Sequence, residues 1–490
     1  MQITDLRPIK CAHQYHVPIG SKNMKKKSPA ENKKYHFIGI GGVGTSGLAM
    51  ILMKEKALIS GSDMQNSTLL KRLTDCGADV KTGHSADNLP ENLNGVVISA
   101  AVKEDNPELQ AARQRKIMVY KYAQMLGLVM DRYRGVAISG THGKSTTSGW
   151  LVYVLQKLGV EPNFVIGADI IQSGVSSGLG GSDVFVAEAC EYDRSFLNLH
   201  PKVGVILNIE PDHLDYYSGI DEIVEAFASF AKNISSDGIL VAGIQDSNAA
   251  KLVAALAGKK EVITFGITDA ATFSAKHIVY TADDTSFDCY QKGMLLGRAT
   301  IKLPGEHNVR NALAVLACIE ALGGDVERAV GFLGGFEGMD RRLMKKAEIN
   351  GIAVLDDYAH HPTEIKASLK ALRQKYGKRK IFCVFQPHQY SRTRFLLKDF
   401  AESFKLADMI IVPDIYFVRD TEKAKSEVNS QILVDKINEK GGKAAFFDTF
   451  ERICDFLKTN VKSTDILISM GAGDVWKVTD EYIQWLRKNS

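Results

Sequence analysis

Short apolar runs alternate along most of the chain with stretches of helical periodicity, and glycine or polar residues separate them. Apolar runs of about four to eight residues, bounded by such turns, are typical of strands buried inside a parallel sheet. We predict such strands at residues 35–38, 57–60, 95–102, 136–139, 184–187, 203–209, 238–242 and 262–266. The alternation of strand and helix predicts an α/β protein.

The same alternation resumes in the C-terminal third of the chain. It predicts strands at residues 352–355, 381–385, 409–412, 444–447 and 466–469. Residues 272–303 instead show short alternating runs, which indicate a small antiparallel insertion. Because 490 residues are too many for one hydrophobic core, we predict three domains, each built on a mostly parallel sheet. Their expected bounds are 35–127, 128–334 and 335–490.

Charge and cysteine content are those of an ordinary soluble protein. Lysine and arginine number 61 and aspartate and glutamate number 57, so the formal net charge of +4 offers little attraction for nucleic acid or anionic lipid. Basic residues gather in residues 1–34, which we interpret as a solvated basic tail. No run approaches the roughly 20 apolar residues of a membrane span. The seven scattered cysteines lack CxxC spacing, which favours a reducing cytoplasm over a cysteine metal cluster.

A glycine turn between the strand predicted at 136–139 and a helix predicted at 147–158 carries the clearest chemistry. Backbone N–H groups of such a turn converge on one concavity, and the positive end of the helix dipole lies behind them, so the turn suits a polyphosphate. Lys144 can bind the outer phosphates, and Ser145 can hold a magnesium ion. Ile138 stands where the usual pattern has glycine, so the turn is short. We predict a P-loop-like ATP site at Gly140, Thr141, His142, Gly143, Lys144, Ser145 and Thr146.

The first predicted domain has a second glycine motif, GxGxxG, with glycines at 39, 41 and 44. Asp63 follows the next strand, near the spacing of a ribose-binding carboxylate, so this domain is predicted to be Rossmann-like. The segment is too short for the second mononucleotide half that NAD needs, which favours a UDP-sugar over a redox cofactor. A UDP-sugar oxidoreductase remains an alternative. The residues expected to bind this substrate are Gly41, Gly42, Gly44, Ser62, Asp63 and Ser99.

Two acidic groups follow predicted strands of the central domain, at residues 188–193 and 208–215. Carboxylates crowded at a strand end repel one another, and a cation relieves that repulsion. We expect Glu188 to share a magnesium ion with Ser145 and the ATP phosphates, and His213 to contribute a second metal site. We also expect Tyr192, Asp193 and Ser195 to contact substrate.

Together with residues 305–312, 356–364, 386–394 and 471–474, these motifs resemble the Mur ligases, and the resemblance extends from about residue 35 to residue 488. It implies a three-domain ligase that uses ATP and Mg²⁺, with a Rossmann-like first domain for the UDP-sugar, a P-loop-like second domain for ATP and a Rossmann-like third domain for the amino acid. The strings around His360 and His388 are most similar to the family member that joins L-alanine to UDP-N-acetylmuramate in peptidoglycan biosynthesis. Domain closure would use hinges near 127–135 and 334–340.

The resemblance also implies roles for residues that spacing alone does not identify. Asn308, Asn311, Arg342 and Asp357 would contact ATP, and the amino acid would lie among Tyr358, His360, His388 and Arg392. The predicted catalytic residues are Lys144, Glu188, His213, His360 and Arg392. Gln389 stands where many relatives carry arginine, and Cys190 where many carry aspartate.

The chemistry expected of such an enzyme is activation of a carboxylate as an acyl phosphate, followed by attack of the alanine amine. The base that accepts the amine proton is His360, water or the departing phosphate. We expect a cytoplasmic monomer or weak homodimer without nucleic-acid or membrane partners. Three alternatives stay open: a recycling ligase that attaches a murein peptide to the same UDP-sugar, the oxidoreductase, and a nucleotide-gated binding protein without turnover.

Overall fold

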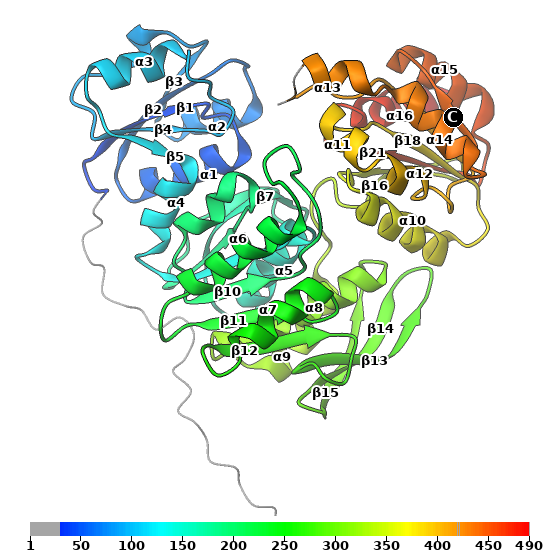
Figure 1. Ribbon diagram of the computed structural model, residues 1–490, viewed down its shortest axis with the longest axis horizontal. Helices are drawn as coiled ribbons and strands as arrows, with labels where there is room; N and C mark the ends of the chain where they lie inside the picture. Colours follow the sequence, from blue (N-terminus) through cyan, green and yellow to red (C-terminus); the bar gives the residue numbers. More distant parts are fainter. Residues whose placement is uncertain (1–29, 419, 421, 490) are drawn as a thin grey trace, which may run out of the picture.

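The computed structural model describes residues 30–418, 420 and 422–489, and Figure 1 shows their arrangement. Three β-sheets, of five, ten and six strands, organise these residues and are flanked by helices, which confirms the predicted α/β fold with mostly parallel sheets. The basic tail, apart from residues 30–34, lies outside the described residues. Among the residues described, no helix has both the length and the apolar character needed to cross a bilayer.

The N-terminal sheet is parallel throughout, with strand order β3-β2-β1-β4-β5. Its strands are β1 (Lys34–Ile38), β2 (Leu58–Asp63), β3 (Asp79–Thr82), β4 (Gly95–Ile98) and β5 (Val119–Lys121). Its helices are α1 (Val43–Lys54), α2 (Thr68–Asp75), α3 (Pro107–Gln114) and α4 (Tyr122–Met130), with the short η1 (Ala86–Asn88). The strand order reverses between β1 and β4, which is where open parallel sheets bind ligands.

The central sheet has the order β15-β14-β13-β12-β11-β10-β6-β9-β7-β8. Its strands are β6 (Arg134–Ser139), β7 (Asn163–Ile170), β8 (Val175–Gly178), β9 (Val184–Glu188), β10 (Val203–Ile206), β11 (Ile239–Gly243), β12 (Glu261–Gly266), β13 (Phe273–Tyr280), β14 (Thr285–Gln291) and β15 (Met294–Ile301). The expected antiparallel segment is confirmed as β13–β15. It extends the main sheet, because β13 pairs in parallel with β12.

Helices cover both faces of the central sheet. They are α5 (Lys144–Lys157), α6 (Ile220–Asn233), α7 (Ser247–Leu256), α8 (Glu306–Ala321) and α9 (Val326–Phe332), with η2 (Tyr192–Asn198) and η3 (Leu333–Gly335). On one face α5 and α8 belong to a core that includes the fully buried Trp150. On the other face α6 and α7 share a continuous apolar cluster with α1 and α4 of the N-terminal domain. Because burying apolar surface is the main stabilising term in folding, this shared cluster fixes the first domain on the second.

The C-terminal sheet has the order β16-β17-β21-β18-β19-β20, with β16 as an antiparallel edge strand. Its strands are β16 (Met344–Ile349), β17 (Ile352–Asp357), β18 (Ile381–Phe385), β19 (Met409–Val412), β20 (Ala444–Phe446) and β21 (Ile466–Met470). Its helices are α10 (Pro362–Tyr376), α11 (Tyr390–Phe395), α12 (Leu397–Ala401), α13 (Glu422–Glu427), α14 (Ser430–Glu439), α15 (Phe450–Asn460) and α16 (Trp476–Lys488).

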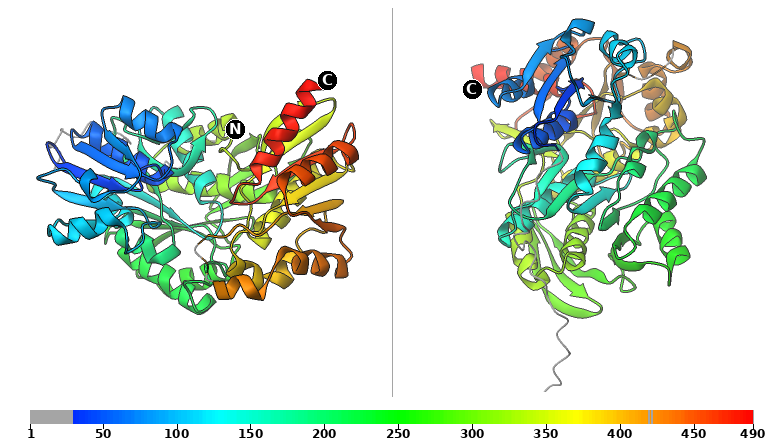
Figure 2. Two further views of the ribbon diagram at one scale, coloured as in Figure 1. Left: turned by 90° about the horizontal axis from the view of Figure 1, so that it is seen from above. Right: turned by 90° about the vertical axis from the view of Figure 1, so that its left-hand side faces the viewer.

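The N-terminal and C-terminal domains lie at opposite ends of the long axis, and each rests on the central domain (Figures 1 and 2). The predicted domain limits at residues 127–128 and 334–335 fall inside α4 and η3. The amino ends of α5 and α10 both reach the junction between the central and C-terminal domains.

Candidate active site

The glycine turn joins β6 to α5, as predicted, and its backbone is held from both sides. Gly140 and Gly143 have φ angles of 139° and 85°, which other residues rarely adopt. A Cβ at Gly143 would lie 2.8 Å from Asn311 Oδ1, so glycine is also required there by space. The Asn208 side chain accepts a bond from the His142 N–H at 2.8 Å and donates to the His142 carbonyl at 3.1 Å. The turn is therefore preorganised, with the N-terminus of α5 behind it.

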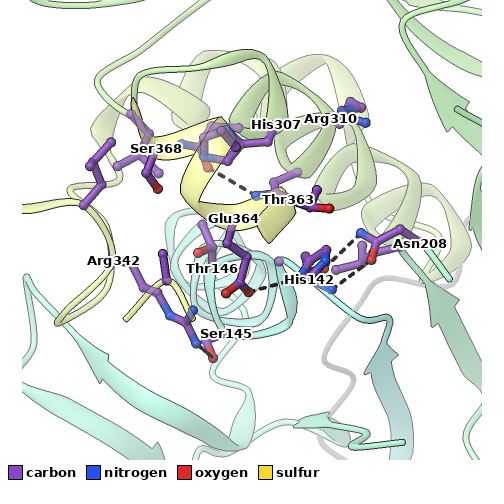
Figure 3. A pocket seen from close by; sticks show the side chains of 18 of the residues that line it. His142, Ser145, Thr146, Asn208, His307, Arg310, Arg342, Thr363, Glu364 and Ser368 are labelled. Carbon is purple, nitrogen blue, oxygen red and sulfur yellow. Dashed lines mark hydrogen bonds and ion pairs between the residues drawn. The ribbon is translucent and has the colours of Figure 1, made fainter. Parts of the chain in front are cut away.

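A cavity of about 290 Å³ lies beside this turn, between the central and C-terminal domains. Figure 3 shows side chains from both domains around it, with Arg342 directed at the Ser145 hydroxyl. Arg342 Nη2 is 3.5 Å from Ser145 Oγ. Eight of the predicted nucleotide-binding residues line the cavity: His142, Gly143, Ser145, Thr146, Asn308, Asn311, Arg342 and Asp357. The other three, Gly140, Thr141 and Lys144, lie in the same turn but do not line it.

The far wall of the cavity comes from α8 and from the end of β17. Asn308 donates to the Pro304 carbonyl at 2.8 Å, and Asn311 donates to Asn308 Oδ1 at 3.2 Å. Burial raises the pKa of Asp357 to about 6. Sequence analysis did not identify several other lining residues, which have no motif of their own: Gln245, Asp246, Phe265 and Ser368. His307 and Arg310, which also line the cavity, lie in the motif at residues 305–312 but were given no role.

The acidic edge of the site follows from sheet order, because β10, β6 and β9 are neighbours and their carboxyl ends meet. Glu188 ends β9, and its carboxylate accepts the Gly167 N–H. Lys144 Nζ pairs with Glu191, at 2.9 Å from Oε2 and 3.1 Å from Oε1. His213 Nε2 lies 3.6 Å from Glu191 Oε1. Sequence analysis singled out Glu188 from the acidic run and missed Glu191, which is buried beside the phosphate-binding lysine.

This edge contains donors suited to a magnesium ion, because carboxylate and hydroxyl oxygens are the ligands that Mg²⁺ prefers. The hydroxyl of Ser145, the carboxylate of Glu188 and the imidazole of His213 are the predicted ligands; Ser145 lies in the first turn of α5, Glu188 ends β9 and His213 lies on the loop after β10. Glu191 and Asp212 lie 3.6 Å and 3.9 Å from His213 Nε2, and each is also paired with a cation, Lys144 and Arg392 respectively. Tyr192 also belongs to this edge, with its ring 5.0 Å from that of His213.

A second group of possible ligands, His142, Glu210 and His361, behaves as an ion-paired contact between domains. Burial alone would lower the pKa of His142, but Glu210 and Glu364 raise it to about 10, so the imidazole is a cation. Its Nδ1 lies 3.0 Å from Glu364 Oε1 on the C-terminal domain. His361 bonds the Pro211 carbonyl through Nε2 and accepts the Thr363 N–H through Nδ1. His361 therefore has both ring nitrogens engaged, and His142 is ion-paired with Glu364 and lies 3.5 Å from Glu210.

The predicted amino-acid residues gather where β17 and β18 end. The His360 ring lies 5.4 Å from that of Tyr358 and 6.0 Å from that of His388. Arg392 Nη1 is 3.2 Å from His388 Nδ1. Burial lowers the pKa of His360 to about 4, and its Nδ1 donates to the Tyr358 carbonyl at 3.0 Å. The neutral imidazole therefore presents the lone pair of Nε2.

Arg392 also contacts a residue that sequence analysis overlooked. Its guanidinium bonds Asp212 of the central domain, and both side chains are buried. Gln389, which stands in place of an arginine, is buried and directs its amide to the Val418 carbonyl at 3.4 Å. The side chain of Cys190, the other departure from the expected pattern, is exposed.

In the N-terminal domain, the glycine motif lies at the point where the strand order reverses. Gly41 donates its N–H to Asp63 Oδ2 at 2.9 Å, and a Cβ at Gly39 would lie 2.6 Å from Ser99 Oγ. Added Cβ atoms at Gly42 and Gly44 would meet Thr45 and Tyr122. The sequence thus brings Gly41, Gly42, Gly44, Asp63 and Ser99 to one place. Asp193 pairs with Lys121 Nζ at 2.8 Å, and the Ser195 carbonyl accepts a bond from the Asn198 side chain.

Ser62 is fully buried and belongs to a polar network around Glu108. Glu108 is also fully buried and accepts bonds from Ser62, from Asn88 and from the Ser85 N–H. Burial would raise the pKa of Glu108, but the hydrogen bonds from His36, Ser62 and Asn88 lower it to about 2. The sequence around Glu108 does not predict this network, because its partners lie 20 to 72 positions away in the sequence.

Comparisons with known proteins agree with this architecture. Residues 34–134 match the model described as Mur ligase family, catalytic domain; residues 138–319 match the Mur ligase middle domain; and residues 341–473 match the Mur ligase, glutamate ligase domain. A UDP-N-acetylmuramate–L-alanine ligase of Caldanaerobacter subterraneus is 41% identical over 458 residues, covering 93% of this chain and 98% of that protein. One from Clostridium botulinum is 43% identical over 459 residues, covering 92% and 98%.

Solved structures show the same likeness. The UDP-N-acetylmuramate-alanine ligase of Thermotoga maritima is 26% identical, with a TM-score of 0.78 over 93% of this chain and all of that one. A murein peptide ligase of Psychrobacter arcticus shares the fold, with a TM-score of 0.69 at 22% identity over 93% of this chain and 99% of that one. The resemblance identified from the motifs is confirmed, and the chain belongs to the Mur ligase family.

Proposed function

We propose that the protein is an ATP-dependent carboxylate-amine ligase of peptidoglycan biosynthesis. It joins L-alanine to the carboxylate of UDP-N-acetylmuramate and yields UDP-N-acetylmuramoyl-L-alanine, ADP and phosphate. The observation that carries the proposal is the cavity between the central and C-terminal domains, where the glycine turn faces Arg342. The names of relatives at 41–43% identity over at least 92% of the chain support the choice of alanine and of this UDP-sugar.

The first half of the reaction must make the sugar carboxylate electrophilic. A carboxylate at neutral pH is negative and resonance-stabilised, so an amine does not displace oxide from it. The carboxylate attacks the γ-phosphate of ATP, and the products are ADP and an acyl phosphate. The backbone N–H groups of residues 143–146, at the start of α5, and the Lys144 ammonium stabilise the charge that develops on the transferred phosphoryl group. A magnesium ion held by Ser145, Glu188 and His213 would supply further neutralisation of this charge.

The contact between Lys144 and Glu191 holds the lysine beside the glycine turn before ATP binds. Lys144 is held by Glu191 and by the carbonyls of Gly140 and Thr141. Bound phosphate draws Lys144 away from these oxygens, and Glu191 is then free to face a cation. The positive charge is in this way held beside the site before nucleotide arrives, and binding exchanges its contacts with Glu191 and the two carbonyls for contacts with phosphate.

In the second half, alanine attacks the acyl carbon and phosphate leaves. Arg392 binds the alanine carboxylate, as a guanidinium suits a planar anion. His360 accepts a hydrogen bond from the amine through Nε2, because Nδ1 is already bonded to Tyr358. With a pKa of about 4, His360 is a weak base and orients the amine, so the departing phosphate or water takes the proton. Tyr358 and His388 complete the walls of this site.

The UDP-sugar binds the N-terminal domain, where Gly41, Gly42, Gly44, Asp63 and Ser99 lie together. The carboxylate of this sugar then lies near the glycine turn, beside the edge formed by Glu188 and Tyr192. Asn308, Asn311, Arg342 and Asp357 bind ATP in the cavity. We place the enzyme in the cytoplasm, as a monomer or weak homodimer, with small molecules as its ligands.

One assay tests the proposal: release of inorganic phosphate with ATP, magnesium and UDP-N-acetylmuramate, offered each amino acid in turn. Alanine should give the highest kcat/KM, and ¹⁸O should pass from the sugar carboxylate into the liberated phosphate. Preference for a tripeptide over alanine would indicate the recycling ligase. Reduction of NAD by the UDP-sugar would indicate the oxidoreductase, and absence of phosphate release under all conditions would indicate a binding protein.

A further inference from the structure

A buried ion pair between two domains involves the arginine assigned to the alanine carboxylate. Asp212 lies on the loop after β10 in the central domain, and Arg392 lies on α11 in the C-terminal domain. Asp212 Oδ1 accepts from Arg392 Nε at 3.0 Å and from Nη2 at 2.9 Å. The two side chains are 8% and 7% exposed, so solvent does not screen their attraction.

The bonds around Arg392 fix its orientation from two sides. Asp212 occupies the edge of the guanidinium formed by Nε and Nη2, and Nη1 faces His388 Nδ1 at 3.2 Å. A guanidinium carries five N–H groups in one plane, so these contacts set the direction of those that remain. The second N–H of Nη2 has no partner within the part of the chain that the structure describes, and it is available to a small carboxylate.

The charge of Asp212 is secured by its neighbours. Asp212 Oδ1 accepts from two N–H groups of the Arg392 guanidinium, and both side chains are buried, so the two groups are held together as an ion pair. An ionised partner keeps Arg392 in one position, whereas a lone buried arginine would turn toward any available oxygen.

We propose that Asp212 is a positioning residue that orients Arg392 for the carboxylate of the amino acid. Because the pair joins two domains, the amino-acid site is complete only while the C-terminal domain is docked on the central domain. The inference rests on the proposed function, in which Arg392 binds the alanine carboxylate. It adds a residue from outside the C-terminal domain to the site for the amino acid.

Other contacts already hold these domains together, so docking alone does not require Asp212. Thr363 donates to Glu210, His361 bonds the Pro211 carbonyl, and His142 bonds Glu364. Loss of Asp212 should thus disturb Arg392 while the domains stay docked. The same loop continues to His213, whose N–H donates to Asp212 Oδ1 at 2.7 Å. The position of Arg392 is in this way tied to the loop that reaches the phosphate side of the site.

The test compares Asp212→Asn and Asp212→Ala with the matched control Asp283→Asn. Asp283 is an exposed aspartate of the central domain in the turn between β13 and β14. Alanine is varied at saturating ATP and UDP-N-acetylmuramate. We expect the KM for alanine to rise at least tenfold in Asp212→Ala and several-fold in Asp212→Asn, which keeps the shape and one acceptor. The KM values for ATP and for the UDP-sugar should stay within twofold, and the control should match the unmodified protein.

Positional isotope exchange in ATP, measured with the UDP-sugar but without alanine, separates positioning from a general defect. The exchange rate should be unchanged in both Asp212 variants, because the first half of the reaction does not use Arg392. An alanine KM within twofold of normal in both variants would overturn the inference, as would a loss of exchange that parallels the loss of ligation. If Arg392→Ala itself left the alanine KM unchanged, the assignment of Arg392 in the proposed function would fail instead.

Discussion

His142 offers the most direct test of how the central and C-terminal domains are held together. It lies in the glycine turn, and its imidazolium contacts Glu364 across the interface while Glu210 lies 3.5 Å from Nε2. Replacing it in His142→Asn keeps a hydrogen-bonding group but removes the charge. Glu364 and Glu210 then face each other without a cation, and like charges in a partly buried site repel one another.

The size of the effect follows from the exposure of these side chains. Breaking a buried ion pair by removing one partner costs about 3–5 kcal/mol. The His142, Glu364 and Glu210 side chains are 14%, 15% and 29% exposed, so solvent screens part of the attraction between them. We therefore expect the loss of His142 to cost about 2–3 kcal/mol. At about 1.4 kcal/mol for each factor of ten, the ratio of docked to undocked molecules falls roughly 30- to 150-fold.

Small-angle X-ray scattering measures this ratio, because undocking of the C-terminal domain raises the radius of gyration. The control is His277→Asn, which removes an exposed histidine paired with Asp288 and should change nothing measurable. The pH dependence gives a second check. The pKa of His142 is raised to about 10 from an ordinary value of 6.5, so its contribution is complete below about pH 6.5 and is lost as the pH rises through 10.

The difference between the unmodified protein and His142→Asn should therefore shrink above pH 9 and vanish above pH 11. Other groups titrate in the same range, but they do so in both proteins, and the difference isolates His142. Identical scattering curves for the two proteins at pH 7 would refute the reasoning. A difference that stays constant from pH 7 to pH 11 would show that the charge of His142 is not the cause.

Four further outcomes follow from the site. Lys144→Ala should abolish ADP formation, because the transferred phosphoryl group loses its ammonium partner; near-normal turnover would remove that role. Arg392→Ala should raise the KM for alanine with little change in the KM for ATP, and steady-state kinetics with each substrate varied will show which rises. Glu188→Gln should increase the magnesium concentration needed for half-maximal rate; an unchanged requirement would exclude Glu188 as a ligand. The pKa of Glu108 is lowered to about 2, so its charge stabilises the N-terminal domain above about pH 4.5, and this stabilisation is lost as the pH falls toward 2. Thermal unfolding of Glu108→Gln and the unmodified protein between pH 3 and pH 7 should therefore differ most at pH 7.

The apolar runs predicted most of the sheet strands, because a strand covered on both faces must be apolar along its length. The segment at residues 203–209 shows this, with the observed strand at Val203–Ile206 fully buried. The strand Asn163–Ile170 was missed although it contains the buried apolar run Phe164–Ile166. Other missed strands lack such runs. Asp79–Thr82 is mostly exposed, Val119–Lys121 is three residues long, and Met344–Ile349 is an edge strand with three charged residues. Pairing with a neighbour, which the local sequence does not contain, makes these segments strands.

The residues of the candidate site were likewise only partly predictable from the sequence. Residues in glycine turns and at strand ends were predictable, because turn geometry and sheet order bring them together. Glu191, Asp212 and Glu364 were not assigned, because their importance comes from charge partners 47 to 222 positions away in the sequence. Glu191 is an example: three carboxylates within six residues were visible in the sequence, but which of them pairs with Lys144 depends on the path of the loop. Sequence patterns identify local geometry such as turns and strand ends. Charge partners that are distant in the sequence can be identified only in the folded structure.

The contacts between the central and C-terminal domains have a practical consequence for engineering. Several of the polar contacts come from two short central loops, at residue 142 and at residues 210–212, which meet α10 and α11. A chimera that exchanges only the C-terminal domain for that of a relative with another amino-acid preference would leave these loops facing foreign partners. Grafting the loops together with the incoming domain should preserve both the docking of the C-terminal domain and turnover. The segment to exchange therefore includes residues from both sides of the domain boundary.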